Sequence, residues 1–425
     1  MEVLREQLLQ HSYPLASVSD GTNFADLQPL KEILRDVRIL GLGESTHGTR
    51  EFFQLKHRIT RFMVEEMGYR IFSIEAGVMP CKNINDYIVY GKGDRAAALA
   101  SQGYWTWDTE EVTEMIEWMR QHNLHCAQGD ECRWLGYDIK PLPDAAATVY
   151  RLLQRVDSAI YAKAQEIIES ILNLPFPYHG DTPPTTDGII WLLGWIKAHE
   201  ISLSEALGQE SLQLLFTACR MIYQFMDNMV VRPMSNEGRN YHMAENIALI
   251  MNSLPADARI VVWAHNAHIS TDPGWPSIGS IMRRRYGSQY FPCALTFTRG
   301  SFQSRLMKAD DPNYFGALQE FTVGEPRPGT WENELAAIRS GDYFLNLRGA
   351  TAADPALKQW AAELRPSFMA GGGYIPDLDA AALQEHDDAS RFSLSASFDG
   401  IFHIENTTRA RPTPTGQRDE AAPAR

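Results

Sequence analysis

The sequence has few cysteines, no long apolar run and no excess of positive charge. Its five cysteines are odd in number and widely scattered, without the paired spacing of a zinc module, so we expect ordinary reduced thiols. The longest apolar clusters, such as 189–193, are far too short to span a bilayer, and no basic region followed by an apolar run opens the chain. These absences favour a cytoplasmic protein.

The 425 residues carry a formal net charge of −14. Nucleic acids and anionic membranes would repel such a chain, so we expect neither as a partner. With 44% hydrophobic residues, the chain can bury a core larger than one simple layer usually holds. We expect one α/β domain that carries an insertion.

A glutamate and a histidine follow the first apolar strand pattern. Residues 38–42 form a short apolar run closed by glycines, Glu44 and His47 come directly after it, and a helix is predicted over 49–67. In open parallel sheets ligands bind at the carboxyl ends of the strands, and a carboxylate beside a histidine orients the ring and stabilises its protonated form. The pair therefore suits general-base catalysis, although Glu44 could simply cap the helix and His47 could be an ordinary turn residue.

Three further strand patterns end in groups of similar chemistry. The runs 70–77, 133–139 and 259–264 end in Glu75, in Asp138, and in the pair His265 and His268. Strands that alternate with helices favour a parallel sheet, whose carboxyl ends meet at one edge. We therefore expect these side chains to share one site with Glu44 and His47.

Helical periodicity dominates the middle of the chain. We predict an α/β fold with a central, mainly parallel sheet flanked by helices, and an all-helical insertion that forms a lid over the cleft. The polar, Pro-rich end of the chain should be disordered. The expected parts are a first core segment 1–143, the insertion 144–253, a second core segment 254–406 and a disordered tail 407–425.

Six elements, in this order, resemble the erythromycin esterase family. They are Gly-Glu-Ser-Thr-His at 43–47, Ile-Glu-Ala-Gly at 74–77, Gly-Tyr-Asp at 136–138, Arg-Asn-Tyr-His-Met-Ala at 239–244, Ala-His-Asn-Ala-His at 264–268 and Phe-Asp-Gly-Ile-Phe at 398–402. The resemblance runs from about residue 20 to about residue 405. Its Glu-x-x-His and His-Asn-x-His elements together are fairly specific.

The resemblance implies that water activated by the histidine at His47 opens the lactone ester of a macrolide, which would inactivate an antibiotic. Glu44, Glu75, His265 and His268 match further active-site positions, and no metal or cofactor is implied. The substrate would be a macrolide or another hydrophobic ester. Which carboxylate pairs with which histidine stays open.

Several other side chains are candidates for contacts with the substrate. Arg50 or Lys56 could support the reaction electrostatically, and Asp138 lies near a strand end. The aromatic residues Tyr104, Trp105 and Trp107 could line a pocket, or they could close the top of the core. The insertion offers further apolar walls at Trp191, Leu192, Trp195 and Phe225.

The chain departs from the family pattern at a few positions. Gly48 stands where macrolide esterases have a bulky residue after the first histidine, so we expect an open or reshaped floor beside the base. Arg239 and Asn240 stand at an Arg/Lys-Asp pair of the family, and Lys56 stands where some members have arginine. The preferred ring can therefore differ from erythromycin.

Four other functions remain open. A serine hydrolase would use Ser45, but the motif lacks the second glycine of a nucleophile elbow. A metallohydrolase would need His265 and His268 on one side, and a continuing strand would point them to opposite faces unless the chain turns between them. The same acid–base groups could dehydrate or rearrange a polyketide. A binding protein could sequester a hydrophobic ligand without turnover.

Overall fold

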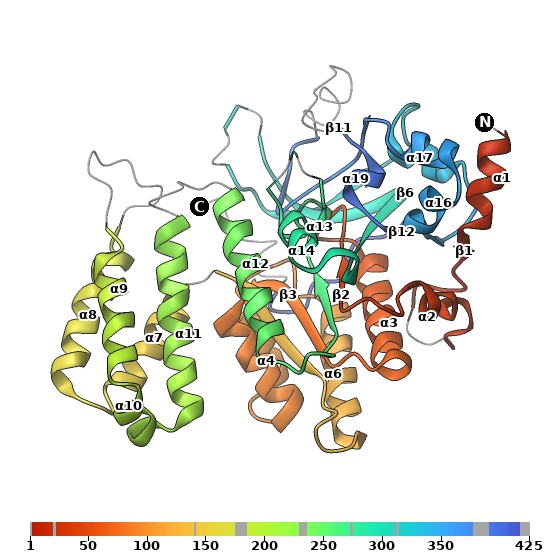
Figure 1. The fold of residues 1–425 in the computed structure, drawn as a ribbon. Helices are drawn as coiled ribbons and strands as arrows, with labels where there is room; N and C mark the ends of the chain where they lie inside the picture. The colour runs from red at the N-terminus through yellow and green to blue at the C-terminus, as the bar shows by residue number, and fades with distance from the viewer. Residues whose placement is uncertain are drawn as a thin grey trace.

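The computed structural model describes residues 2–19, 23–139, 142–174, 185–228, 236–272, 274, 276–308, 310–311, 314–376 and 391–416. The strands of its main sheet are β1 (Ser12–Pro14), β2 (Ile39–Leu42), β3 (Ile71–Gly77), β4 (Arg133–Asp138), β5 (Ile260–Trp263), β6 (Tyr290–Leu306), β7 (Leu318–Val323), β8 (Tyr343–Leu345), β10 (Gly373–Tyr374) and β12 (Gly400–Thr407). The main path of this ten-stranded sheet runs β1-β8-β12-β6-β2-β5-β3-β4, while β7 and β10 pair with β6 (Figure 1). A separate pair is formed by β9 (Arg365–Pro366) and β11 (Arg391–Phe392).

The centre of the sheet is parallel, as predicted. Strands β12, β6, β2, β5, β3 and β4 all pair in parallel, and the antiparallel pairs lie at β8, β1 and β7. Every residue of β2 and β5 is buried. Strands covered on both faces read as continuous apolar runs, which is why these two were recognisable in the sequence.

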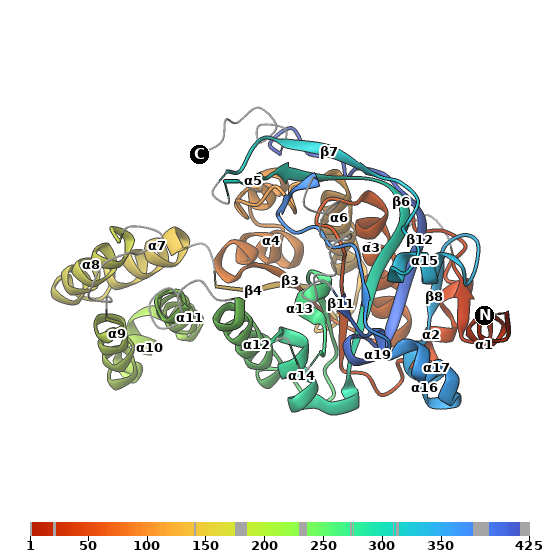
Figure 2. The ribbon, with the colours of Figure 1, turned by 90° about the horizontal axis from the view of Figure 1, so that it is seen from above.

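Helices cover both faces of the sheet (Figure 2). The helices are α1 (Glu2–Gln10), α2 (Pro29–Ile33), α3 (Arg50–Met67), α4 (Val78–Tyr90), α5 (Arg95–Ala100), α6 (Glu110–His125), α7 (Leu142–Leu153), α8 (Ser158–Leu172), α9 (Asp187–Ala198), α10 (Glu200–Leu207), α11 (Gln209–Met226), α12 (Asn236–Asn252), α13 (Asn266–Ile269), α14 (Ile278–Tyr286), α15 (Trp331–Ala336), α16 (Leu347–Ala353), α17 (Pro355–Ala361) and α19 (Leu394–Ser397). None of the described helices is both long and apolar enough to cross a membrane.

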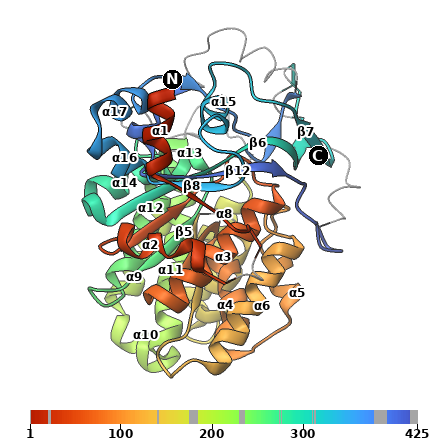
Figure 3. The same cartoon turned by 90° about the vertical axis from the view of Figure 1, so that its right-hand side faces the viewer.

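Two hydrophobic cores lie on opposite faces of the sheet. Leu40 and Leu42 of β2 pack into a core with α3, α4 and α6, whereas Ile39 packs into a second core with α12 and α14. Neighbouring residues of a strand point to opposite faces, so one short strand contributes to both cores. Figure 3 shows α1 beside α17 at the β8 end of the sheet, where the two helices are in contact.

The helical insertion is smaller than the predicted span 144–253. Helices α7 to α11 share a core of their own and stand beside the β4 edge of the sheet (Figure 1). Helix α12, by contrast, buries Met243 and Ile247 in the core of the sheet and contacts β4. Its helical periodicity alone could not tell a bundle helix from one that covers a sheet. We call α7 to α11 the helical bundle.

Residues 408–416 are packed, although the tail 407–425 was predicted to be disordered. Arg411 donates to the buried carboxylate of Glu111, and Pro412 forms a bridge with Thr109 at the start of α6. Charged and polar anchors hold this segment, so its lack of apolar residues was a misleading sign. The remainder, 417–425, lies outside the described residues.

Candidate functional site

Four neighbouring parallel strands bring the predicted groups to one edge of the sheet. In the order β2-β5-β3-β4, the chain carries Glu44 just past β2, His265 just past β5, Glu75 near the end of β3 and Asp138 at the end of β4. The strands are in parallel register, for example Leu42 with Trp263. The predicted convergence of these side chains is therefore found in the structure.

Glu44 holds His47 in one tautomer. The carboxylate is fully buried, and its Oε1 lies 2.6 Å from Nδ1 of His47. Its Oε2 accepts from Nζ of Lys56 at 2.5 Å and from the indole N–H of Trp263 at 2.8 Å. Lys56 and Trp263 can only donate, so Oε2 is an acceptor, and a carboxylate accepts on Oε1 as well, which places the proton of this contact on Nδ1 of His47. The lone pair of Nε2 is then available for a proton.

Lys56 is a buried cation behind this pair. Its side chain is fully inaccessible, and Nζ lies 4.3 Å from the ring centre of Trp263 in addition to its contact with Glu44. Burial lowers the pKa of Lys56 to about 8, against the opposing effect of Glu44. Lys56 therefore supports Glu44 from inside the protein and does not face a ligand.

His265 carries its proton on the other nitrogen. It caps α13, and its Nδ1 accepts from the backbone N–H of Ala267 at 3.3 Å, so the proton resides on Nε2. Burial lowers the pKa of His265 to about 3, helped by His47 and His268 and opposed by Glu75 and the Ser45 carbonyl. The ring is thus neutral near pH 7; the Ser45 carbonyl lies near enough to affect its pKa, but no described residue forms a hydrogen bond of full geometry with its buried Nε2.

The rings of His47 and His265 lie next to each other. Their centres are 5.0 Å apart and their planes are tilted by 56°. One ring offers a lone pair on Nε2 and the other offers an N–H donor, because their Nδ1 atoms are held by a carboxylate and by a backbone amide respectively. A base and a neutral donor side by side can activate water and bind the oxygen that becomes negative.

Glu75 belongs to a second cluster with His268 and Arg239. Its Oε1 lies 2.9 Å from Nη2 of Arg239 and 3.1 Å from Nε2 of His268, and its Oε2 accepts from the backbone N–H of His265 at 3.1 Å. Burial alone would raise the pKa of Glu75, but His268, Arg239 and His47 hold it well below its ordinary value. Glu44 therefore pairs with His47, whereas Glu75 pairs with His268 and accepts a hydrogen bond from the backbone N–H of His265.

Arg239 from α12 closes this cluster, and it was not among the predicted site residues. It donates to both oxygens of Asp138, at 3.1 and 2.8 Å, as well as to Glu75. Asn240 accepts from Nδ1 of His268 at 2.6 Å, and its amide is oriented by donation to the Pro276 carbonyl. The only sequence signal was the Arg-Asn element of the family resemblance, since helical periodicity does not show which side chains reach the sheet.

The aromatic segment before α6 serves the core and the site at once. Trp107 packs in the core, and its ring meets His47 edge-on at 5.7 Å between centres. Burial and Asp138 raise the pKa of Tyr104, with Glu75 adding to the effect, so its hydroxyl stays protonated near this acidic cluster. Trp105 is also buried. Trp107 therefore closes the core, as one interpretation predicted, and also lies beside His47 of the site, as the other predicted.

Two predicted candidates have side chains that make no hydrogen bond with either histidine of the pair in the described residues. The Arg50 side chain turns toward α6, where its Nε lies 3.5 Å from Glu111. Ser45 is buried, and its Oγ makes no hydrogen bond to any described residue, so no histidine activates it. Arg50 was predicted as a substrate contact, and Ser45 was the nucleophile of the alternative serine hydrolase.

Of the two predicted effects of Gly48, an open or a reshaped floor beside the base, the structure excludes the open floor. A Cβ at this position would lie 2.0 Å from the Gln303 carbonyl oxygen and 2.5 Å from its side chain. The backbone N–H of Gln303 donates to the carbonyl of Gly48, which brings the two chains together. Glycine is needed here because β6 passes so close.

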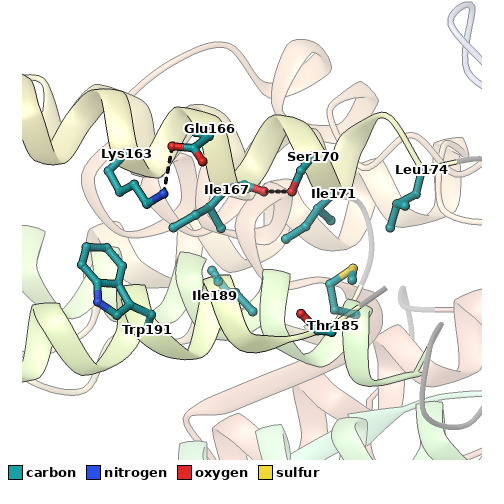
Figure 4. Close-up of a pocket in the computed structure, with 11 residues that line it drawn as sticks. Lys163, Glu166, Ile167, Ser170, Ile171, Leu174, Thr185, Ile189 and Trp191 are labelled. Atoms are coloured by element: carbon teal, nitrogen blue, oxygen red, sulfur yellow. Dashed lines mark hydrogen bonds and ion pairs between the residues drawn. The ribbon is translucent and has the colours of Figure 1, made fainter. Parts of the chain in front are cut away.

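The predicted apolar walls in the helical bundle serve the bundle itself. Leu192 lies in the bundle core, and Trp195 and Phe225 pack against it. Trp191 lines a cavity of about 500 Å³ between α8 and α9, together with Lys163, Ile167 and Ile189 (Figure 4). None of the site residues described above lines this cavity.

The donors of the site do not suit a metal ion. Within the described residues no group of three or more His, Cys, Asp or Glu side chains could hold one. The short helix α13 does supply the turn between His265 and His268 that a shared metal would need. However, Nε2 of His265 is a donor, and Arg239 already places a positive charge between Glu75 and Asp138.

The fold and site define a class of α/β enzyme with a carboxylate-held histidine at the ends of parallel strands. A family model described as Erythromycin esterase matches residues 64–407, and the chain belongs to that family. Erythromycin esterase type II of Escherichia coli is 23% identical, over 91% of this chain and 93% of that protein. Membership of this family supports a hydrolase.

Solved structures share the fold. A Bacillus cereus protein has a TM-score of 0.78 at 21% identity, with 97% of this chain and 99% of that chain covered. A mutant of erythromycin esterase EreC in its open conformation has a TM-score of 0.66 at 14% identity, with 96% and 98% covered. At such identities these likenesses concern the fold alone.

Proposed function

We propose that this chain opens the lactone ester of a macrolide by general-base hydrolysis, and so inactivates such a compound. The observation that carries the proposal is the arrangement of His47 and His265, a base and a neutral donor fixed in opposite tautomers. The family supports ester hydrolysis, and the E. coli relative is named for erythromycin.

The reaction needs one water molecule and no cofactor. Nε2 of His47 takes a proton from water as its oxygen attacks the lactone carbonyl carbon, and Glu44 offsets the positive charge that forms on the ring. The N–H of His265 donates to the carbonyl oxygen as it becomes negative. When the intermediate collapses, the ring C–O bond breaks and the leaving alkoxide takes the proton from His47, which gives a hydroxy acid.

His268 is a candidate for the leaving-group side of the reaction. Because Nδ1 donates to Asn240, Nε2 of the neutral ring accepts from Arg239, and the protonated ring can donate to Glu75. Tyr104 is a candidate hydroxyl donor to the substrate in the same cluster.

Mass spectrometry of a macrolide panel tests the proposal directly. Hydrolysis adds the mass of one water to the ring compound, dehydration removes it, and a binding protein depletes free ligand without product. The His47→Asn variant serves as the matched control. If no macrolide and no other ester gains water, while wild-type protein is folded, the proposed reaction is wrong.

A further inference from the structure

A second chain segment lies beside the loop that carries His47. Ala370 forms a parallel bridge with Thr46, and its backbone N–H donates to the carbonyl of Ser45 at 2.7 Å. In a parallel pair the residues advance in step, so Gly371 is the next neighbour of His47. The segment thus lies along the base although about 320 residues separate them in sequence.

Contacts with β6 support this placement. Oγ of Ser304 donates to the carbonyl of Gly371 at 3.3 Å, and the backbone N–H of Gln303, the preceding residue, donates to the carbonyl of Gly48 at 3.0 Å. Gln303 and Ser304, which are consecutive in β6, therefore hydrogen-bond to the His47 loop and to the segment of Gly371 respectively. This ties Gly371 to the His47 loop through two independent sets of hydrogen bonds.

The glycines at 371 and 372 are not explained by the backbone or by packing. Neither has a backbone φ in the left-handed region, and no described atom lies within 4 Å of where a Cβ would be. Gly48 and Gly373 differ, because a Cβ there would meet Gln303 at 2.0 Å and the Met307 sulfur at 2.1 Å. A residue with a side chain would fit at 371 and 372 without strain.

The outward face of this segment is apolar and open. Phe368 and Ala370 are buried, whereas Met369 is 36% exposed, as expected for an extended chain with alternating side chains. Gly371 follows Met369 by two residues and so continues the same face. A Cβ at Gly371 would meet no described atom within 4 Å, so this face has open space beside Met369.

We propose that Met369 and Gly371 form the wall of the substrate site that admits a large apolar ring. This rests on the proposed function and adds to it the residues that limit ring size. Gly371 leaves room for the body of the ring while the lactone carbonyl is at His47, and Met369 provides an apolar contact. Large ligands need wide, mostly apolar sites, which a side chain at 371 would narrow.

A series of side chains at Gly371 tests this wall. We expect the Kd of erythromycin, measured by calorimetry, to rise in the order Gly371→Ala, Gly371→Val, Gly371→Phe, by about tenfold or more at Val, because overpacking costs about 1–3 kcal/mol. Gly324→Val is the matched control, since that loop glycine also has φ outside the left-handed region and no described atom near its Cβ, and it should bind as wild type does.

The outcomes distinguish a steric effect at Gly371 from an effect of backbone flexibility, and they distinguish binding of the ring from its hydrolysis. A full loss already at Gly371→Ala with no increase at Val or Phe would mean that glycine provides flexibility, and the wall would be wrong. Unchanged affinity in all variants, or a wild type that binds no erythromycin, would also overturn it. If wild type binds erythromycin and the graded loss is seen, but no water is added, the wall stands and the proposed reaction fails.

Discussion

Glu44 fixes the protonation of the base through the donors on its two oxygens. Lys56 and Trp263 occupy Oε2, and His47 occupies Oε1, so the proton of the pair is placed on the ring. Without those donors, a buried carboxylate would tend to take the proton itself. The buried residues behind Glu44 therefore determine that His47 is a base.

Replacement of the base is the first prediction at this scale. His47→Asn should lower kcat by about 10²–10⁴-fold, the usual cost of losing a general base, while circular dichroism and the melting temperature stay close to those of wild type. His125→Asn is a suitable control, because that histidine is exposed on α6 and only contacts the Gln121 carbonyl. Near wild-type kcat in His47→Asn would refute the assignment.

Lys56 gives the site a distinct pH dependence. Its pKa is lowered to about 8, so above this pH the amine becomes neutral and Glu44 loses its cationic partner. The hydrogen bond from Nζ to Oε2 of Glu44 is then no longer charge-assisted, so Glu44 holds the His47 ring less firmly, and kcat/KM should fall as pH rises through about 8. Lys56→Arg keeps the charge and should extend activity to higher pH. Identical alkaline limbs in the two pH profiles would exclude this role of Lys56.

Ser45 provides a test of the serine hydrolase mechanism. Its buried Oγ has no hydrogen-bond partner among the described residues, so Ser45→Ala removes no hydrogen bond that the structure shows. We expect kcat close to wild type and stability changed by about 0.5 kcal/mol or less. Loss of all turnover, together with an acyl adduct on Ser45 detected by mass spectrometry in wild type, would support a nucleophilic serine instead.

At the scale of elements, strand ends were predictable and helix contacts were not. Compact apolar runs identified β2 and β5, and alternation with helices predicted that Glu44, Glu75 and His265 would meet. The contribution of Arg239 depends on how α12 is rotated against the sheet, which periodicity does not define. Gly48 was misread because the close passage of β6 is a contact between segments far apart in sequence.

The segment 408–416 should stabilise the start of two catalytic elements. Arg409 pairs with Thr49 and Pro412 with Thr109, and Arg411 compensates the buried Glu111. Arg411→Ala should lower the free energy of unfolding by about 1–3 kcal/mol, because a hydrogen-bonded buried carboxylate loses its partner. Chemical denaturation measures this, and Lys163→Ala in an exposed ion pair is the control, with at most about 0.5 kcal/mol.

Truncation separates the packed part of the tail from the rest. A chain that ends at Gly416 should behave as the full chain does, whereas a chain that ends at Thr408 should be less stable and less active, since Thr49 and Thr109 flank His47 and Trp107 in sequence. Equal stability of both truncated chains would show that the contacts of Arg411 and Pro412 contribute nothing measurable.

At the scale of the whole molecule, the chain has two structural units of different kinds. The sheet holds two cores, one on each face, that are joined through its strands, whereas the helical bundle has a third core that includes one residue of α4, Met79. All the site residues belong to the sheet, its flanking helices and their loops. The bundle meets this unit at α12, where Gln224 of α11 and Asn246 exchange hydrogen bonds, and none of the hydrogen bonds given above for His47 and His265 comes from the bundle.

Opening of the helical bundle should be separable from unfolding of the sheet. Leu215→Ala creates a cavity in the bundle core at a cost of about 2–5 kcal/mol, and Leu345→Ala is the matched change in the sheet at β8. Hydrogen exchange should then rise in α7 to α11 alone in Leu215→Ala, with the sheet still protected and ester hydrolysis near that of wild type. In Leu345→Ala the sheet strands should lose protection. Loss of turnover in Leu215→Ala without loss of sheet protection would instead make the bundle part of the working site, as the predicted lid requires.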